Sequence, residues 1–339
     1  MTLSDPQQPI AVLGAGSWGT TLALVLNGKG LNVRLWEFRQ DAVERLRADR
    51  ENKEFLPGIP LPESLEIHHD ARECLADAQV VLLAIPSQFV RGALLQMTDF
   101  FPRGAIIINA AKGIEEITLM RPSEVVEEIY PGTWPDRYVA LSGPSHAEEV
   151  SRGIPTTVVA GSANIDTAKT VQELFFTSTF RVYTRHDLVG VELGGALKNV
   201  IAIATGIADG LGFGDNTKGA LLTRGLAEMS RLGIKLGGHP ETFAGLSGMG
   251  DLITTCMSRH SRNRYVGEQI GKGKTLDEVM QTMTMVAEGV KTTVSSRELA
   301  HREQVPMPIT EAIYSILFEN KPVKEVVFEL MTRELKLED

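Results

Sequence analysis

A single lysine stands in the middle of an apolar stretch, residues 191–210 (VELGGALKNVIAIATGIADG). The apolar side chains recur at steps of three and four residues, which predicts a buried helix. Small residues, among them Gly194 and Gly195, share the helix face of Lys198, so another molecule could approach its amine closely. An ammonium group that loses hydration there has a lowered pKa, which suits proton transfer. The alternative is a core helix whose lysine extends to water.

Two later segments carry polar side chains suited to a substrate. Residues 245–251 (GLSGMGD) end in Asp251, which could cap a helix, or could orient Lys198 and bind a substrate hydroxyl. Residues 258–264 (SRHSRNR) contain three arginines and Asn263. The guanidinium group matches phosphate oxygens, and the amide adds a neutral donor. This segment predicts an anion site, with a solvated basic turn as the alternative.

The first residues follow the pattern of a dinucleotide-binding loop. An apolar run at 10–13 precedes the sequence GAGSWG, and residues 20–26 then have a helical pattern. Strand, glycine loop and helix in this order make the motif meaningful. Gly14 allows the tight turn, Gly16 lets backbone N–H groups approach a pyrophosphate, and Gly19 lets helix and strand pack closely. The helix N-terminus favours the phosphate charge.

The choice between NAD and NADP stays open at the end of the second expected strand, residues 32–36. Glu37 there could bind the ribose hydroxyls of NAD, whereas Arg39 could bind the 2′-phosphate of NADP. Either residue could also be a solvated loop charge. The sequence therefore predicts NAD or NADP.

Strand signals stop after Thr184, which indicates a domain boundary near residue 190. Further strands are expected at 79–84, 105–110, 138–141, 155–160 and 179–183, with a helix at 166–175. From Leu188 onward the pattern is helical. We expect an α/β protein with a Rossmann-type doubly wound sheet in residues 1–190, followed by an all-α substrate-binding domain in residues 191–339.

Loops at the carboxyl ends of these strands are candidate ligand contacts, because such ends line the crevice of a doubly wound sheet. Lys112 follows the strand at 105–110, and Ser145 and His146 follow the strand at 138–141. Each could instead be a loop residue without a role in binding.

The composition excludes several classes of protein. A net charge of −9 argues against nucleic acid or an acidic membrane surface as the partner. Cys74 and Cys256 are far apart and lack zinc-like spacing, which indicates a reducing compartment. The N-terminal MTLSDPQQP has no signal-peptide character, and no uninterrupted apolar run is long enough to span a bilayer. No metal site is expected around the His68–His69 pair. The predicted location is the cytoplasm.

Together, these segments resemble the bacterial NAD(P)-linked glycerol-3-phosphate dehydrogenases, soluble enzymes of phospholipid precursor synthesis. The resemblance covers nearly the whole chain and rests on GAGSWGT, AAKGIE, LSGPSHAEE, VELGGALKNVIAIATGIADGLGFGDNTK, LLTRGLAEM, GLSGMGDLITTC, SRNRYVG and VAEGVKTT. It implies that sn-glycerol 3-phosphate and dihydroxyacetone phosphate are interconverted by hydride transfer with NAD or NADP. It leaves a homodimer open as the assembly.

The resemblance also implies residue roles, with Lys198 as the catalytic proton acceptor. Substrate contacts would come from Lys112, Gly143, Ser145, Lys198, Asp251, Ser261, Arg262 and Asn263. Cofactor contacts would come from Ser17, Trp18, Phe38, Lys112, Ala147, Arg262, Val286 and Glu288, beside Gly14, Gly16, Gly19 and Arg39 argued above. Phe38 stands where some NADPH-preferring relatives carry a polar residue, so the resemblance does not imply a preference for NADPH.

Two other functions remain as alternatives. Arginine and lysine also bind carboxylates, which would suit a related two-domain hydroxyacid dehydrogenase. A nucleotide-sensing protein without turnover is the second, and the lysine beside glycines together with Asp251 argues against it. Aldehyde oxidation through Cys256 is disfavoured, because a lone cysteine is usually a small buried hydrophobe.

Overall fold

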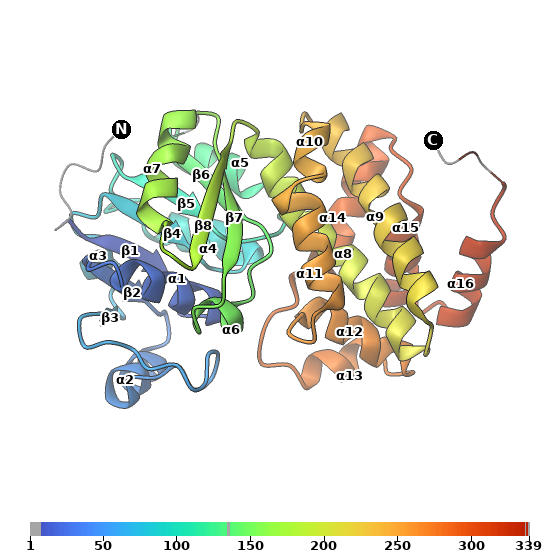
Figure 1. Ribbon diagram of the computed structural model, residues 1–339, viewed down its shortest axis with the longest axis horizontal. Helices are drawn as coiled ribbons and strands as arrows, with labels where there is room; N and C mark the ends of the chain where they lie inside the picture. The colour runs from blue at the N-terminus through green and yellow to red at the C-terminus, as the bar shows by residue number, and fades with distance from the viewer. Residues whose placement is uncertain (1–7, 134–135, 336, 338–339) are drawn as a thin grey trace.

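The computed structural model describes residues 8–133, 136–335 and 337. Most of the N-terminal segment on which the signal-peptide prediction rests, residues 1–7, lies outside this description. The chain forms a sheet flanked by helices and then an all-helical part that begins at α8 (Leu188–Gly210) (Figure 1). The predicted combination of a Rossmann-type sheet and an all-α C-terminal domain is confirmed.

The sheet has eight strands in the order β3-β2-β1-β4-β5-β6-β7-β8. All neighbouring strands are parallel except β6 and β7, which are antiparallel. The strands are β1 (Ile10–Leu13), β2 (Val33–Trp36), β3 (Glu66–His68), β4 (Val80–Leu83), β5 (Ile106–Asn109), β6 (Tyr138–Ser142), β7 (Thr156–Gly161) and β8 (Phe180–Arg185). Only β3 was not predicted. It is a three-residue edge strand, too short for a periodic signal, and His68 in it pairs with Glu66.

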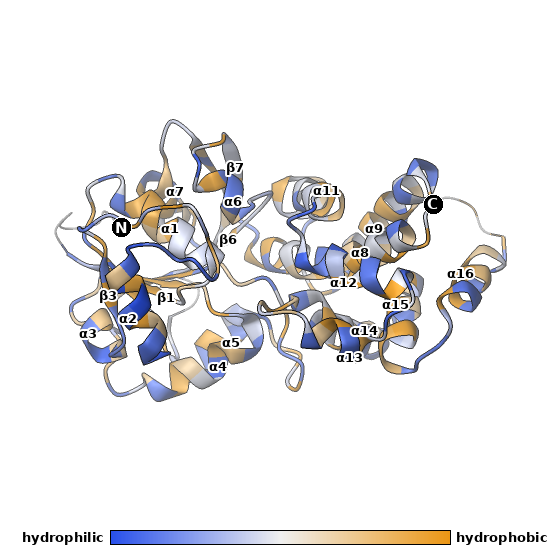
Figure 2. Ribbon diagram, turned by 90° about the horizontal axis from the view of Figure 1, so that it is seen from below, coloured by the Kyte–Doolittle hydropathy of each residue, from blue (hydrophilic) through white to orange (hydrophobic). Residues whose placement is uncertain are grey.

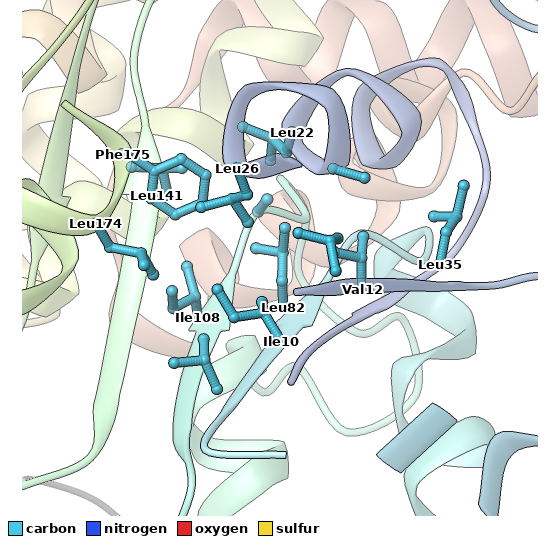
Figure 3. Close-up of a cluster of buried hydrophobic side chains, with 14 of the residues drawn as sticks. Ile10, Val12, Leu22, Leu26, Leu35, Leu82, Ile108, Leu141, Leu174 and Phe175 are labelled. Carbon is cyan, nitrogen blue, oxygen red and sulfur yellow. The ribbon is translucent and has the colours of Figure 1, made fainter. Parts of the chain in front are cut away.

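Helices cover both faces of the sheet, which explains why its central strands are continuous runs of Val, Ile and Leu. Leu22 and Leu26 of α1 and Leu174 of α7 pack on one face (Figure 3). Val90 and Leu94 of α4 pack on the other. The helices of this part are α1 (Ser17–Asn27), α2 (Gln40–Asp49), α3 (Ala71–Leu75), α4 (Ser87–Gln96), α5 (Pro122–Ile129), α6 (Ala147–Val150) and α7 (Ile165–Phe175).

Helix α8 is the core of the helical domain, and α9, α11, α12 and α14 pack around it (Figure 1). Among the described residues it is the one helix long and apolar enough to cross a membrane, but 94% of its apolar window is buried inside the protein. It is therefore a core helix. The other elements are α9 (Asp215–Lys235), α10 (Pro240–Phe243), the π-helix η1 (Leu246–Gly250), α11 (Asp251–Met257), α12 (Arg262–Gly271), α13 (Leu276–Gln281), α14 (Glu288–Glu303), α15 (Pro308–Phe318) and α16 (Val323–Met331).

Two kinds of contact fix α8 in place. Against α12 the backbones touch: a Cβ on Gly206 would lie 2.0 Å from the Arg264 oxygen, and a Cβ on Gly267 would lie 2.0 Å from the Ile203 oxygen. Toward the sheet, the buried Glu192 carboxylate accepts hydrogen bonds from Ser123 N and Oγ (3.0 and 2.6 Å), Arg121 (2.9 Å) and the Tyr138 hydroxyl (2.9 Å). The helix that carries Lys198 is thus held to both halves of the protein.

Candidate active site

Lys198 forms a buried ion pair with Asp251, the first residue of α11. Its Nζ donates to Asp251 Oδ1 at 2.7 Å and to Thr255 Oγ1 at 2.6 Å. The lysine is 6% exposed and the aspartate 2%, so the lysine does not extend to water. The Asp251 side chain does not cap α11. Thr255 was not predicted, although it lies one helical turn after Asp251 and therefore on the same face.

A second lysine reaches the same carboxylate from the sheet. Lys112, in the loop after β5, donates to Asp251 Oδ2 at 2.7 Å, to the Gly143 carbonyl at 3.0 Å and to Ser145 Oγ at 3.5 Å. Gly143 and Ser145 follow β6, which pairs in parallel with β5, so the two loops leave the same edge of the sheet. Asp251 thus lies between one ammonium from each domain.

The two lysines keep the carboxylate charged, while burial makes Lys198 a weaker base than usual. Burial lowers the pKa of Lys198 from 10.5 to about 8, with the Asp251 charge opposing the shift and the Lys112 charge adding to it. Burial alone would raise the pKa of Asp251, but both ammonium groups outweigh it and hold that pKa below its usual range. An amine with this pKa can accept or donate a proton close to neutral pH.

The small residues beside Lys198 do not leave an open face, so that expectation was wrong. A Cβ on Gly194 would lie 2.7 Å from the Ser247 carbonyl oxygen, and a Cβ on Gly195 would lie 2.6 Å from Ser142 Oγ. These glycines instead let η1 and the end of β6 pack directly against α8. The close approach to these glycines is therefore made by other segments of the protein and not by a ligand.

The three arginines near residue 260 differ in their environment. Arg264 is held by Asp209, to which its Nε donates at 2.7 Å, so its role is structural. The exposed Arg262, at the start of α12, has no acidic partner within ion-pair distance among the residues that the structure describes. Arg259 is also exposed and has no ion-pair partner among these residues, so Arg259 and Arg262 are the guanidinium groups left for an anion. Arg262 is the one directly beside Asn263, which contacts the segment of the lysine pair through Asn199.

Asn263 links α12 to the loop that carries Lys112 through Asn199. Its Nδ2 donates to Asn199 Oδ1 at 2.9 Å, and its Oδ1 accepts from the Gly289 N–H at 2.9 Å. Asn199 Nδ2 in turn donates to the Lys112 carbonyl at 3.0 Å. Ser261 caps α12 by accepting from the Arg264 N–H at 3.2 Å. These contacts place the segment 261–263 next to the lysine pair, and no sequence signal singled out Asn199.

His146 lies in the same loop as Ser145 and faces the helical domain. Its Nε2 is 3.5 Å from the Thr254 carbonyl, and its ring centroid is 5.8 Å from that of His260. Burial, with the Lys198 charge as the next contribution, lowers the pKa of His146. The neutral ring therefore packs between the two domains.

The glycine loop after β1 has the geometry of an anion cradle. Gly14 has φ +112°, and a Cβ on Gly19 would lie 1.9 Å from the Gly14 oxygen, so helix and loop are in backbone contact. A Cβ on Gly16 would meet nothing within 4 Å, which leaves space above the loop. Helix α1 starts at Ser17 without a side-chain cap and without an acid in its first turn. Its free N–H groups fit the pyrophosphate of a dinucleotide.

The remaining candidates for the cofactor lie on both sides of this loop. Trp18 Nε1 is buried and has no hydrogen-bond partner within the described part of the chain. Ala147 contacts α1 through its carbonyl, which accepts from Thr21 Oγ1 at 3.4 Å. Phe38, 66% exposed, and Arg39 follow β2, which β1 and β4 separate from β5. They are therefore distant in the sheet from the lysine pair.

Val286 and Glu288 approach the sheet from the helical domain. Val286 is exposed, whereas the Glu288 carboxylate accepts from the Ser87 N–H at 2.7 Å and from Ser87 Oγ at 2.6 Å. Ser87 begins α4, so Glu288 supplies the cap that α4 lacks in its own segment. This contact joins the domains in addition to those of Glu192 and Asp251.

Comparison with known proteins gives matches along nearly the whole chain. Residues 9–168 match the N-terminal part of NAD-dependent glycerol-3-phosphate dehydrogenase, and residues 187–328 match its C-terminal part. The chain is 55% identical over 329 residues to the glycerol-3-phosphate dehydrogenase (NAD(P)+) of Chlorobium phaeobacteroides (strain BS1), covering 97% of this chain and 98% of that one. A relative from Geobacter sp. (strain M21) is 54% identical over 334 residues, 98% of this chain and 99% of its own.

A solved structure agrees with the fold over the same range. The glycerol-3-phosphate dehydrogenase from Coxiella burnetii superimposes with a TM-score of 0.93 at 39% sequence identity. The match covers 97% of this chain and 100% of that chain.

We expect Asp251→Asn to lower the free energy of unfolding by about 3–5 kcal/mol at pH 7, since it leaves two ammonium groups without their shared counter-ion. The loss should shrink as the pH rises through about 8, because Lys198 becomes neutral there and no longer needs the carboxylate. Urea unfolding at pH 6, 7 and 9 measures both effects. Asp166→Asn, which breaks the exposed pair with Lys169, is the control and should change little. Equal stability of Asp251→Asn and wild type at pH 7 would contradict this account.

Proposed function

Because the chain belongs to the family of NAD-dependent glycerol-3-phosphate dehydrogenases, we propose that Lys198 is the proton carrier of its reaction. The enzyme interconverts sn-glycerol 3-phosphate and dihydroxyacetone phosphate with NAD or NADP and supplies glycerol phosphate for phospholipid synthesis. The two alternative functions are set aside, since relatives over half identical along the whole chain carry this activity in their names. The observation that supports Lys198 most is its buried pair with Asp251 at the edge of the sheet.

The reaction needs a hydride acceptor and a group that takes the proton of the C2 hydroxyl. NAD or NADP supplies the first when it is bound. Neutral Lys198 accepts the hydroxyl proton, and in the reverse direction its ammonium donates one to the carbonyl oxygen. Asp251 holds the amine at 2.7 Å, and Lys112 keeps Asp251 ionised. Burial brings the pKa of the amine to about 8, so both protonation states are accessible near neutral pH.

The phosphate of the substrate is placed beside the start of α12 in this proposal. Arg262 supplies an unpaired guanidinium, and Ser261 and Asn263 lie on either side of it in the chain. Gly143 and Ser145, already in contact with Lys112, hold the glycerol end. Binding the phosphate at a distance from C2 turns its interaction energy into orientation of the reacting carbon.

The cofactor residues are assigned by their positions around the glycine loop. Gly14, Gly16, Ser17, Trp18 and Gly19 hold the pyrophosphate end, and Phe38 and Arg39 lie toward the adenosine. Ala147, Lys112, Arg262, Val286 and Glu288 lie toward the nicotinamide. Glu288 is engaged by Ser87, so it would act there through the carboxylate that also caps α4.

We also propose a cellular compartment and an assembly for the protein. Both cysteines are free and buried, which supports the cytoplasm as the compartment. For the assembly we propose a homodimer. Helix α16 lies at the end of the molecule farthest from the sheet and carries apolar segments (Figure 2), among them the exposed Phe328 and Met331. The mass of the purified chain by light scattering tests this assembly.

Lys198→Met should lower kcat by about 10²–10⁴-fold, because general acid–base help of that size is lost. The variant should still fold and bind reduced cofactor, because Lys112 remains as the counter-ion of Asp251, but its thermal midpoint should fall, since Asp251 Oδ1 loses its charged donor. In the wild type, kcat/KM for glycerol 3-phosphate should rise with pH through about 8, as the amine becomes neutral. Lys169→Met, at an exposed position on α7, serves as the control. A Lys198→Met enzyme with near-normal kcat would remove Lys198 from this role.

Arg262→Ala should raise KM for both phosphorylated substrates by roughly 10–100-fold, with a smaller effect on kcat, because a charge-assisted contact to the phosphate is lost. Steady-state kinetics in both directions measure it. Arg259→Ala removes an exposed arginine three residues away and is the matched control. Equal KM values in the Arg262 variant and the wild type would rule out the phosphate contact.

A further inference from the structure

A cavity of about 270 Å³ lies where β1 and β2 end, and its charged walls bear on the choice of cofactor. Its lining includes Ala15 of the glycine loop, Glu37 after β2, and Glu51, Glu54 and Phe55 of the loop after α2. In a doubly wound sheet, the adenosine ribose of a dinucleotide binds at this position. Residues here decide whether a ribose hydroxyl or a 2′-phosphate is accepted.

Arg39 is the cation at the end of β2, and two carboxylates hold it. Its NH1 and NH2 donate to the two oxygens of Glu54 at 3.3 and 3.0 Å, a bidentate pair. Its Nε donates to Glu37 Oε1 at 3.2 Å, and its backbone N–H donates to the same oxygen at 3.1 Å. The guanidinium is therefore engaged on both edges and is not free for a phosphate.

The other cations that line the cavity are also paired. Arg45 contacts Asp41 at 2.5 Å and, more weakly, Glu54 at 3.6 Å, and Lys53 contacts Asp49 at 3.0 Å. The cavity walls include the cations Arg39, Arg45 and Lys53 and the anions Glu37, Asp49, Glu51 and Glu54. A phosphate dianion would thus meet more negative than positive charge. A ribose diol would meet the Glu37 carboxylate, whose second oxygen has no donor among the described residues.

We propose that Glu54 is a specificity-determining residue that commits the site to NADH by holding Arg39. NADPH binds only when its 2′-phosphate displaces the Glu54 carboxylate from Arg39, whereas NADH binds with the pair intact. This inference deepens the proposed function, because it concerns the cofactor of that reaction. The affinity for each cofactor, however, can be measured without any turnover.

The test is the dissociation constant of NADH and of NADPH, followed by the fluorescence of the reduced nicotinamide without substrate. The wild type should bind NADH about tenfold or more tightly than NADPH. Glu54→Gln should tighten NADPH about tenfold, since it releases a guanidinium for a charge-assisted contact. The affinity for NADH should stay within about twofold, because Glu37 is retained. Glu54→Ala replaces the glutamine variant if the latter does not fold.

Two controls test whether the gain in NADPH affinity depends on Arg39 or only on the net charge of the cavity. Asp49→Asn removes one negative charge from the same cavity without touching Arg39, and should leave the ratio of affinities close to that of the wild type. Arg39→Ala combined with Glu54→Gln should abolish the gain for NADPH. Tighter binding of NADPH by the wild type, or an equal gain in Asp49→Asn, would overturn the proposal. A chain that binds both cofactors but oxidises no glycerol 3-phosphate would refute the function and leave this test intact.

Discussion

One buried carboxylate with a lysine on each side determines how the two domains meet. Asp251 comes from the helical domain, Lys198 from its core helix and Lys112 from the sheet. Charges this deeply buried are tolerated only when each has a partner in good geometry. The domain arrangement and the position of the buried Lys198 amine therefore depend on each other. Glu192 and Glu288 add contacts across the same boundary, so the position of Lys198 relative to the glycine loop is set by three acids.

The fold could be read from the sequence because its signals are local. Buried parallel strands appear as short runs of Val, Ile and Leu, and the glycine loop requires φ +112° at Gly14 and backbone contact at Gly19. The three-residue β3 was not predicted, because an alternation of apolar and polar residues cannot be recognised over three positions. Lys198 and Asp251 could be chosen by residue type and neighbours, and their pairing was one of two alternatives for Asp251. Lys112 could be chosen by its place after a strand, but its contact with the same carboxylate could not be predicted.

The sequence did not reveal which hydrogen-bond or ion-pair partner each polar side chain has in the folded protein. Asn199 and Asn263 bind each other across 64 positions, and Arg264 is paired with Asp209, whereas Arg262 has no ion-pair partner in the described part of the chain. The glycines beside Lys198 were interpreted as an open approach, whereas η1 and β6 fill it. Composition and spacing give the kind of group present, and only the three-dimensional arrangement decides which groups are free to act.

The burial of α8 has a consequence for synthesis on the ribosome. This helix has the length and hydropathy of a membrane span and is covered mainly by α9, α11, α12 and α14, which follow it in the chain. At roughly 5–20 residues per second, α8 leaves the exit tunnel several seconds before α14 ends at Glu303. During that interval the nascent chain exposes an apolar helix that its later neighbours do not yet cover, and such a surface is prone to aggregation.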